Sequence, residues 1–209
     1  MPDIANILRL PNQKVNRWTN NYWDNRFGKK YDNRYSWKVE NSKAVNFLTL
    51  VEFYTFIQLR DSGVTATKAL KAHEELAEIE NTSYPFAKKN IIDNICTDGK
   101  RIYFSYNGNI LSLDGSRQFN LDFIKYFFKK LDFGENDLAK RLWPLGKDRN
   151  IVCDPARRFG QPVIDGTNIL AATICNLYKS GEKEEFIASL YDLTVPQIND
   201  ALEYCGKKN

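Results

Sequence analysis

The segment from residue 154 to residue 169 limits the possible fold more than any other part of the chain. It reads D-P-A-R-R-F-G-Q-P-V-I-D-G-T-N-I, and it is rich in Gly, Pro and Asp although helical patterns follow it. Asp154-Pro155 and Asp165-Gly166 predict turns, because proline fixes φ and glycine accepts a positive φ. Val163 and Ile164 form a short β-prone run between them. The segment therefore predicts a tight β-hairpin that leads into a helical unit.

Three short helices are predicted after this hairpin. The first covers residues 171–179 and ends at Ser180-Gly181, and the second covers residues 183–191. Thr194 and Gln197 fit a capping box that opens a third helix. Three helices of this kind predict a homeodomain-like trihelical unit, with a plain helical protein-binding module as the alternative.

Two short amphipathic helices at the start of the chain, separated by Leu10-Pro11, predict a helix-turn-helix. Asp3 is placed to cap the first helix and Asn12 to cap the second. Val15 and Trp18 lie on the inward face of the second helix and have structural roles. The outward face of the second helix carries Gln13, Lys14, Asn16 and Arg17. These are the candidate DNA contacts, because the amides of Gln13 and Asn16 suit adenine, and Lys14 and Arg17 suit guanine or phosphate.

Residues 20–41 are polar, aromatic and basic, and they lack a helical period. This composition predicts a loop or a hairpin "wing", because aromatic side chains interleaved with basic ones suit phosphate contact. A lid over a small core is the alternative, and the wing is the favoured interpretation. Lys29, Lys30 and Arg34 are the candidate phosphate contacts here.

Residues 42–61 predict a long helix that is apolar nearly all round, so it should be buried or should pair with a second chain. Ser62-Gly63 ends it, and Thr65 begins another helix. His73, the only histidine, falls near the inward face of that next helix. A packed, hydrogen-bonded histidine is favoured there over a catalytic one.

The middle of the chain predicts a small antiparallel meander. Asp98-Gly99 and Asn107-Gly108 separate short β-prone runs, and such dipeptides between apolar runs are strong hairpin signals. Asp114-Gly115 follows the last run. The predicted strands cover residues 91–96, 100–106 and 109–113, a predicted helix covers 121–131, and 132–149 form a connector.

The predicted fold class is therefore α+β and mainly helical. It combines an N-terminal winged helix-turn-helix, a β-meander, and a C-terminal hairpin with three helices. We expect three domains, at residues 1–83, 84–149 and 150–209.

Positive charge is concentrated at the start of the chain, although the net charge is only +4. Residues 1–60 carry ten Lys and Arg against five Asp and Glu, residues 61–146 carry twelve of each sign, and residues 147–209 carry eight basic against nine acidic. A basic patch attracts polyanions such as DNA. A solvated basic surface is the alternative interpretation.

Several classes of protein are disfavoured. No apolar run is long enough to span a membrane, and the N-terminus lacks the pattern of a signal peptide. Cys96, Cys153, Cys175 and Cys205 are widely spaced, so buried reduced thiols in a cytoplasmic protein are expected rather than zinc ligands or disulfides. There is no phosphate loop, nucleophile elbow or metalloprotease motif. We expect no enzyme activity, no cofactor and no metal.

The C-terminal segment, with D-P-A-R-R-F-G-Q-P-V-I-D-G-T-N-I and three helices, resembles a widespread uncharacterised bacterial domain that is linked to VapB-type antitoxins. The N-terminal part resembles the helix-turn-helix, related to MerR-type readers, that precedes this domain in longer members. Asn168 departs from the pattern, because the family usually has Arg there. The matching segments outside the C-terminal signature are residues 3–5, 15–18, 47–53, 84–87, 98–100 and 143–146.

The resemblance implies an antitoxin that binds its operator DNA, represses its own operon and holds a PIN-domain ribonuclease toxin encoded beside it. The toxin would use Mg²⁺, whereas the antitoxin would need no cofactor. We expect a homodimer whose second helix enters the major groove. A pure protein-interaction module and a stand-alone transcription regulator without a toxin remain alternatives.

Overall fold

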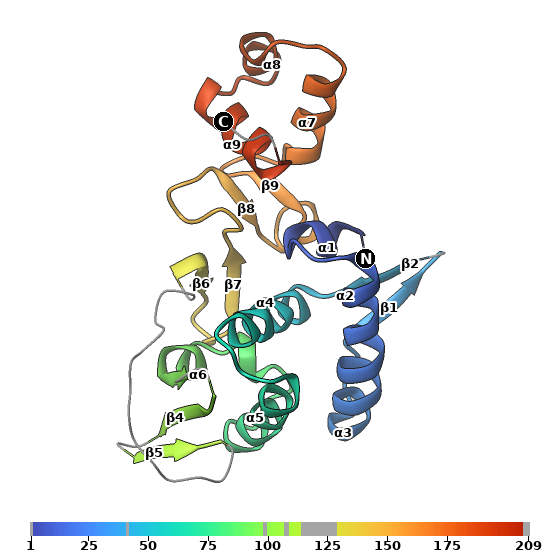
Figure 1. The fold of residues 1–209 in the computed structure, drawn as a ribbon. Coiled ribbons are helices and arrows are strands. Elements are labelled where there is room, and N and C mark those ends of the chain that lie inside the picture. The colour runs from blue at the N-terminus through green and yellow to red at the C-terminus, as the bar shows by residue number, and fades with distance from the viewer. Residues whose placement is uncertain (1, 41, 98–99, 107–108, 114–128, 207–209) are drawn as a thin grey trace. The chain divides into compact units, whose positions relative to one another are not determined.

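The computed structural model describes residues 2–40, 42–97, 100–106, 109–113 and 129–206 (Figure 1). The predicted turns at 98–99, 107–108 and 114–115, and the predicted helix up to residue 128, lie outside the described residues. The chain divides into two compact units. The first comprises residues 1–128 and 133–139, and the second comprises residues 129–132 and 140–209.

The first unit begins with α1 (Pro2–Ile7) and a long helical rod. The rod consists of α2 (Asn12–Trp18), a π-helix η1 (Thr19–Gly28) and α3 (Lys29–Tyr31), which follow one another without a break, and Figure 1 draws them as one coil. The prediction that residues 20–31 are not helical is therefore wrong. The π-helix buries Thr19, Trp23, Phe27 and Gly28, so one side of the rod faces the interior of the first unit.

The end of the rod depends on Gly28. A Cβ atom there would lie 3.0 Å from the Asn33 carbonyl oxygen and 3.2 Å from that of Trp23. Asp32, at φ 47°, then turns the chain out of the helix. The close approach of the backbone explains why this position needs glycine.

A hairpin follows the rod, as the wing prediction anticipated for part of this region. Strands β1 (Ser36–Val39) and β2 (Ser42–Val45) pair antiparallel, with Ser36 opposite Val45. The prediction of helix from residue 42 is wrong at its start. Helix α4 (Phe47–Asp61) begins after Asn46, whose side-chain oxygen accepts a hydrogen bond from the Thr49 N–H at 2.7 Å.

Helix α4 is buried within the first unit, which agrees with its apolar composition. Helix α5 (Ala66–Ile79) packs against it and is capped by Thr65, as predicted. The short helices η2 (Pro85–Ala87) and α6 (Lys89–Asn94) follow. The buried residues of α4 are Thr49, Leu50, Val51, Glu52, Phe53, Thr55, Phe56, Ile57 and Leu59.

The predicted meander is present, with one shifted boundary. Strands β3 (Ile95–Thr97), β4 (Ile102–Tyr106) and β5 (Asn109–Ser112) form an antiparallel sheet in that order. The prediction of strand over residues 91–94 is wrong, because these residues belong to α6. Ile91 and Ile92 are buried there, on adjacent positions of the helix.

A four-stranded sheet has the order β6 (Leu131–Phe133), β7 (Ala139–Leu142), β8 (Ile151–Cys153) and β9 (Pro162–Ile164). Strands β8 and β9 pair antiparallel, with Val152 opposite Val163, and residues 154–161 connect them. The prediction of a tight hairpin within residues 154–169 is therefore right only in part, because β8 lies before that segment.

Three helices complete the second unit, and their positions agree with the prediction. They are α7 (Ala171–Lys179), α8 (Glu184–Tyr191) and α9 (Val195–Tyr204). Thr194 and Gln197 form the predicted capping box at the start of α9. Buried Asp200 on α9 accepts hydrogen bonds from Arg149 Nη1 at 3.0 Å and from the Asn150 N–H at 2.9 Å, which ties α9 to the loop before β8.

The cysteines of the second unit differ from expectation. Cys175 on α7 and Cys205 after α9 form a disulfide, so the prediction of reduced thiols is wrong for this pair. It was wrong because a separation of 30 residues gives no local signal of contact. Cys153 is a free, buried thiol, and burial raises its pKa.

Two further properties concern the described residues only. No helix among them has the length and apolar character needed to cross a membrane. In the same part of the chain, no three His, Cys, Asp or Glu side chains are grouped so that they could hold a metal ion.

Candidate nucleic-acid interface

The predicted base-contacting residues lie on the first two turns of the rod. Gln13 and Arg17 are exposed, whereas Lys14 and Asn16 are half-buried. Lys14 Nζ lies 5.0 Å from the centre of the Trp18 ring, a cation–π contact. Val15 and Trp18 are buried, as predicted. Of the four predicted contacts on α2, Gln13 and Arg17 are therefore the most exposed to solvent.

The predicted phosphate contacts occupy different surroundings. Lys29 is exposed. The Lys30 ammonium pairs with the Glu78 carboxylate at 2.8 Å. The Arg34 Nε donates to the Ser36 carbonyl oxygen at 3.1 Å, and its guanidinium lies over the Trp37 ring. Of these three cations, Lys29 therefore has the fewest intramolecular contacts.

Ion pairs between the rod and α5 reduce the net positive charge of the rod. Besides Lys30–Glu78, Arg26 Nε lies 2.7 Å from Glu74 Oε1. The hydrogen bond between these two raises the pKa of Arg26 and lowers the pKa of Glu74. Two acidic residues of α5, Glu74 and Glu78, therefore connect α5 to the rod.

The hairpin is attached to the rod through Asp24. Its carboxylate accepts a hydrogen bond from Ser36 Oγ at 2.7 Å and pairs with Lys43 Nζ at 2.9 Å. These contacts connect both strands of the hairpin to the middle of the rod. The hairpin is therefore held beside the helix that carries the candidate DNA contacts.

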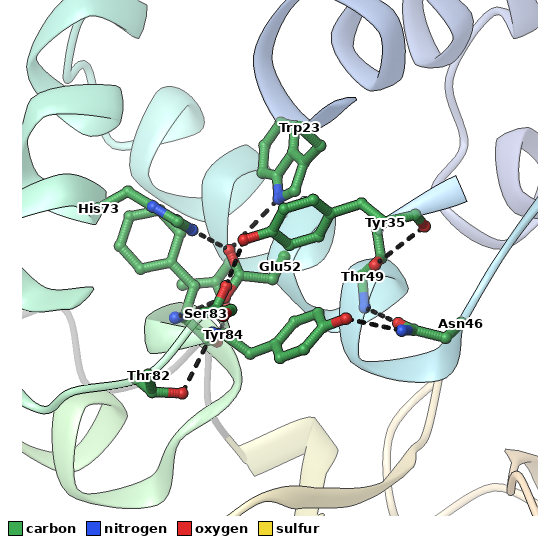
Figure 2. A network of polar contacts seen from close by, with 11 residues as sticks. Trp23, Tyr35, Asn46, Thr49, Glu52, His73, Thr82, Ser83 and Tyr84 are labelled. Atoms are coloured by element: carbon green, nitrogen blue, oxygen red, sulfur yellow. Dashed lines mark hydrogen bonds and ion pairs between the residues drawn. The ribbon is translucent and has the colours of Figure 1, made fainter. Parts of the chain in front are cut away.

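Glu52 is the centre of a buried network that fixes the inner face of the rod (Figure 2). It is fully buried on α4, and its carboxylate accepts from Trp23 Nε1 at 3.4 Å and from the Phe86 N–H at 2.8 Å. The same carboxylate lies 2.6 Å from His73 Nε2. One side chain thus connects the rod, α4, α5 and η2.

His73 is packed and hydrogen-bonded, as the sequence predicts. Its ring is fully buried and stacks on Phe27, with ring centres 3.9 Å apart. Phe86 meets it edge-on at 5.0 Å. Because neither His73 nor Glu52 is exposed, the pair has no access to a substrate. We interpret it as a structural connection rather than a catalytic site.

A second group of contacts extends the network to the hairpin (Figure 2). The Tyr35 hydroxyl donates to the Ser83 carbonyl oxygen at 2.6 Å, and Thr49 Oγ1 donates to the Tyr35 carbonyl oxygen at 3.3 Å. Asn46 Nδ2 donates to the Tyr84 hydroxyl at 2.8 Å. Burial raises the pKa of Tyr35, which keeps its hydroxyl protonated as a donor.

Glu52 was not predicted as a functional or structural centre, although His73 was expected to be packed and hydrogen-bonded. One signal was present: Glu52 is the only charged residue in the run F-L-T-L-V-E-F-Y-T-F-I, and a charge in such a helix needs a partner when it is buried. Its partners Trp23, His73 and Phe86 are distant from it in the sequence, so no local pattern indicated their contact with Glu52.

Comparison with known proteins places this chain near antitoxins. Residues 151–205, from β8 to the end of α9, match the family model described as "Protein of unknown function (DUF433)". Over 172 residues the chain is 26% identical to "Putative antitoxin VapB45" of Mycobacterium tuberculosis, which covers 75% of this chain and 70% of that protein. The chain is thus a distant homologue of a protein named as an antitoxin.

Two other relatives come from the same organism. A stretch of 57 residues is 39% identical to "Uncharacterized protein Rv2308", and it covers 27% of this chain and 24% of that protein. The fold is similar to the X-ray crystal structure of Rv2018, with a TM-score of 0.67, 20% identity and coverage of 96% of this chain and 95% of the other. This last similarity concerns the fold alone.

Proposed function

We propose that this protein is a DNA-binding antitoxin of a type II toxin–antitoxin pair. It represses its own operon, neutralises a PIN-type ribonuclease toxin, acts as a cytoplasmic homodimer and catalyses no reaction. The observation that carries this proposal is the similarity to "Putative antitoxin VapB45" over three quarters of the chain. The exposed polar face of α2 supports the DNA-binding part.

In this proposal α2 enters the major groove. The amides of Gln13 and Asn16 suit adenine, and Lys14 and Arg17 suit guanine or phosphate. Lys29 follows the π-helix η1 on the same rod, twelve residues beyond Arg17. Its exposed ammonium suits a phosphate contact.

Lys30 and Arg34 were also proposed for phosphate contact. DNA phosphates would have to compete with Glu78 for Lys30 and with the hairpin carbonyl for Arg34. We therefore rank their contribution below that of Arg17 and Lys29. The buried network around Glu52 supports the proposal indirectly, because a rigid helix loses little conformational entropy when it binds.

Co-expression with the product of the neighbouring gene, followed by size-exclusion chromatography and gel shift over a series of salt concentrations, tests the proposal. We expect a co-eluting complex and an operator affinity that falls steeply with salt, because bound cations release counterions from DNA. A complex without DNA affinity would indicate a protein-interaction module. DNA binding without a complex would indicate a stand-alone regulator.

A further inference from the structure

The connection between β8 and β9 carries an exposed aromatic side chain in an unusual backbone conformation. The side chain of Phe159 is 100% exposed, and its backbone is left-handed, at φ 57°. Arg158 before it and Gly160 after it also have positive φ, at 45° and 80°. Left-handed backbone is unfavourable for residues other than glycine, and so is a large apolar side chain in water.

The rest of the loop holds Phe159 in this position. Arg157 Nη1 donates to the Thr167 carbonyl oxygen at 2.8 Å, and Arg158 Nε donates to the Asn168 carbonyl oxygen at 2.9 Å. Gly160 is buried, and its N–H donates to the Arg157 carbonyl oxygen at 3.0 Å. Two arginine side chains therefore fasten the loop to the turn at Thr167 and Asn168, and the aromatic ring is left exposed.

From this arrangement we infer that Phe159 is the anchor of a protein–protein contact, with Arg158 at its rim. The inference rests on the proposed function, and it names the surface that the toxin contacts. Aromatic and arginine side chains are enriched in the energetically dominant centres of protein interfaces. A contact would cover the exposed ring, while the braced loop would need no reorganisation.

The exposed Phe159 ring suits an apolar pocket on the partner, and the neighbouring arginines suit carboxylates at the edge of that pocket. The loop of residues 154–161 carries Arg157 and Arg158, and its only acidic residue is Asp154. Asp154 accepts a hydrogen bond from the Ala156 N–H at 2.9 Å and lies 3.8 Å from Arg141 Nε, so it is occupied within the chain. An arginine has five N–H donors, and Arg158 uses one of them for the Asn168 carbonyl oxygen. Its remaining N–H groups are therefore available to bind a carboxylate.

A protein is favoured over DNA as the occupant of this surface. A phenylalanine wedge with nearby arginines also occurs in proteins that bend DNA through the minor groove. However, residues 147–209 carry nine acidic against eight basic residues, so this part of the chain lacks the excess of positive charge that DNA binding requires. A protein pocket has to complement only the exposed ring and the two loop arginines, and carboxylates at the edge of an apolar pocket do so.

The test compares Phe159→Ala, Arg158→Ala and the control Phe186→Ala in the full chain. Phe186 is a half-exposed phenylalanine of the same unit, on α8. The probes are the purified product of the neighbouring gene and an operator fragment, and affinities are measured by biolayer interferometry. We expect Phe159→Ala to weaken toxin binding about 30-fold or more and Arg158→Ala about tenfold, with Phe186→Ala within about threefold of wild type.

The outcomes separate this inference from the proposed function. Equal toxin affinity of wild type and Phe159→Ala would overturn the assignment of Phe159 and leave the antitoxin proposal standing. Loss of operator affinity in Phe159→Ala, with toxin binding intact, would also overturn it in favour of a DNA wedge. If the wild-type chain does not bind the gene product at all, the proposed function and this inference both fail.

Discussion

The two units of this protein are stabilised in different ways. The first unit depends on a buried polar network, in which Glu52 connects segments that range from Trp23 to Phe86. The second unit depends on an apolar core, local helix caps and a disulfide between α7 and the end of α9. Buried polar groups must keep their partners, so the network couples the rod, α4, α5 and η2 to one another. The comparison is therefore between a unit in which one buried carboxylate links four segments and a unit in which a covalent bridge and local caps add to the apolar core.

The largest expected effect follows from replacing Glu52. Glu52→Leu leaves His73 Nε2, Trp23 Nε1 and the Phe86 N–H buried without their acceptor, so we expect a loss of about 3–5 kcal/mol in the free energy of unfolding. Denaturant unfolding followed by tryptophan fluorescence and circular dichroism measures it. Glu75→Ala is the matched control on α5, and it should cost about 0.5 kcal/mol or less. A Glu52→Leu protein as stable as wild type would show that the network is not the source of stability.

The second prediction concerns the disulfide. Cys205→Ser should lower the stability of the second unit by about 2–4 kcal/mol, because the bridge no longer restricts the unfolded chain. Reduction of the wild type with dithiothreitol should produce the same shift in thermal unfolding, and the variant should not respond to the reductant. If dithiothreitol leaves wild type unchanged, the bridge does not contribute, and the contrast between the units becomes weaker.

The third prediction assigns DNA affinity to one unit. Arg17→Ala should cost about 1–3 kcal/mol of operator binding if Arg17 contacts a base. Arg158→Ala in the second unit is the control for loss of one exposed arginine, and it should leave gel-shift affinity unchanged. An unchanged affinity of Arg17→Ala would remove Arg17 from the interface.

The smallest effect is expected at a helix cap. Thr194→Ala removes the side chain that accepts from the Gln197 N–H, and it should cost about 1 kcal/mol. Lys183→Ala, at the start of α8, serves as the comparison, because Lys183 makes no side-chain cap hydrogen bond. Thermal unfolding of the two variants measures the difference. Equal melting temperatures would argue that local caps do not determine the stability of the second unit.

The helices of the second unit were predictable because their signals are local. The capping box lies within four residues, and Gly181 and Gly206 follow the helix ends that they terminate, both with positive φ. The turn at Asp165-Gly166 was predicted for the same reason, and Gly166 has a positive φ, whereas strand β8 lies before the signature segment and was not predicted. The Cys175–Cys205 bridge was not predictable, because contact between α7 and α9 depends on the packing of the whole unit.

The helix α2 was predicted, but the continuation of the rod through η1 was not, because the contacts that fix it are distant in the sequence. Trp23 and Phe27 find their partners on α4 and α5. Of the side chains predicted to be exposed on α2, Gln13 and Arg17 are exposed, whereas Lys14 and Asn16 are half-buried. The ion pair of Lys30 with Glu78 was not predicted, because 48 residues separate the two.

The buried network has a consequence for sequence divergence. Gln13, Arg17 and Lys29 take no part in the contacts around Glu52, and substitutions of exposed side chains usually change stability by about 0.5 kcal/mol or less. The outer face of the rod is therefore free to vary while the inner face is constrained. If α2 binds the operator as proposed, a few substitutions on α2 are sufficient to change operator specificity in a paralogue that keeps Glu52, His73 and Trp23.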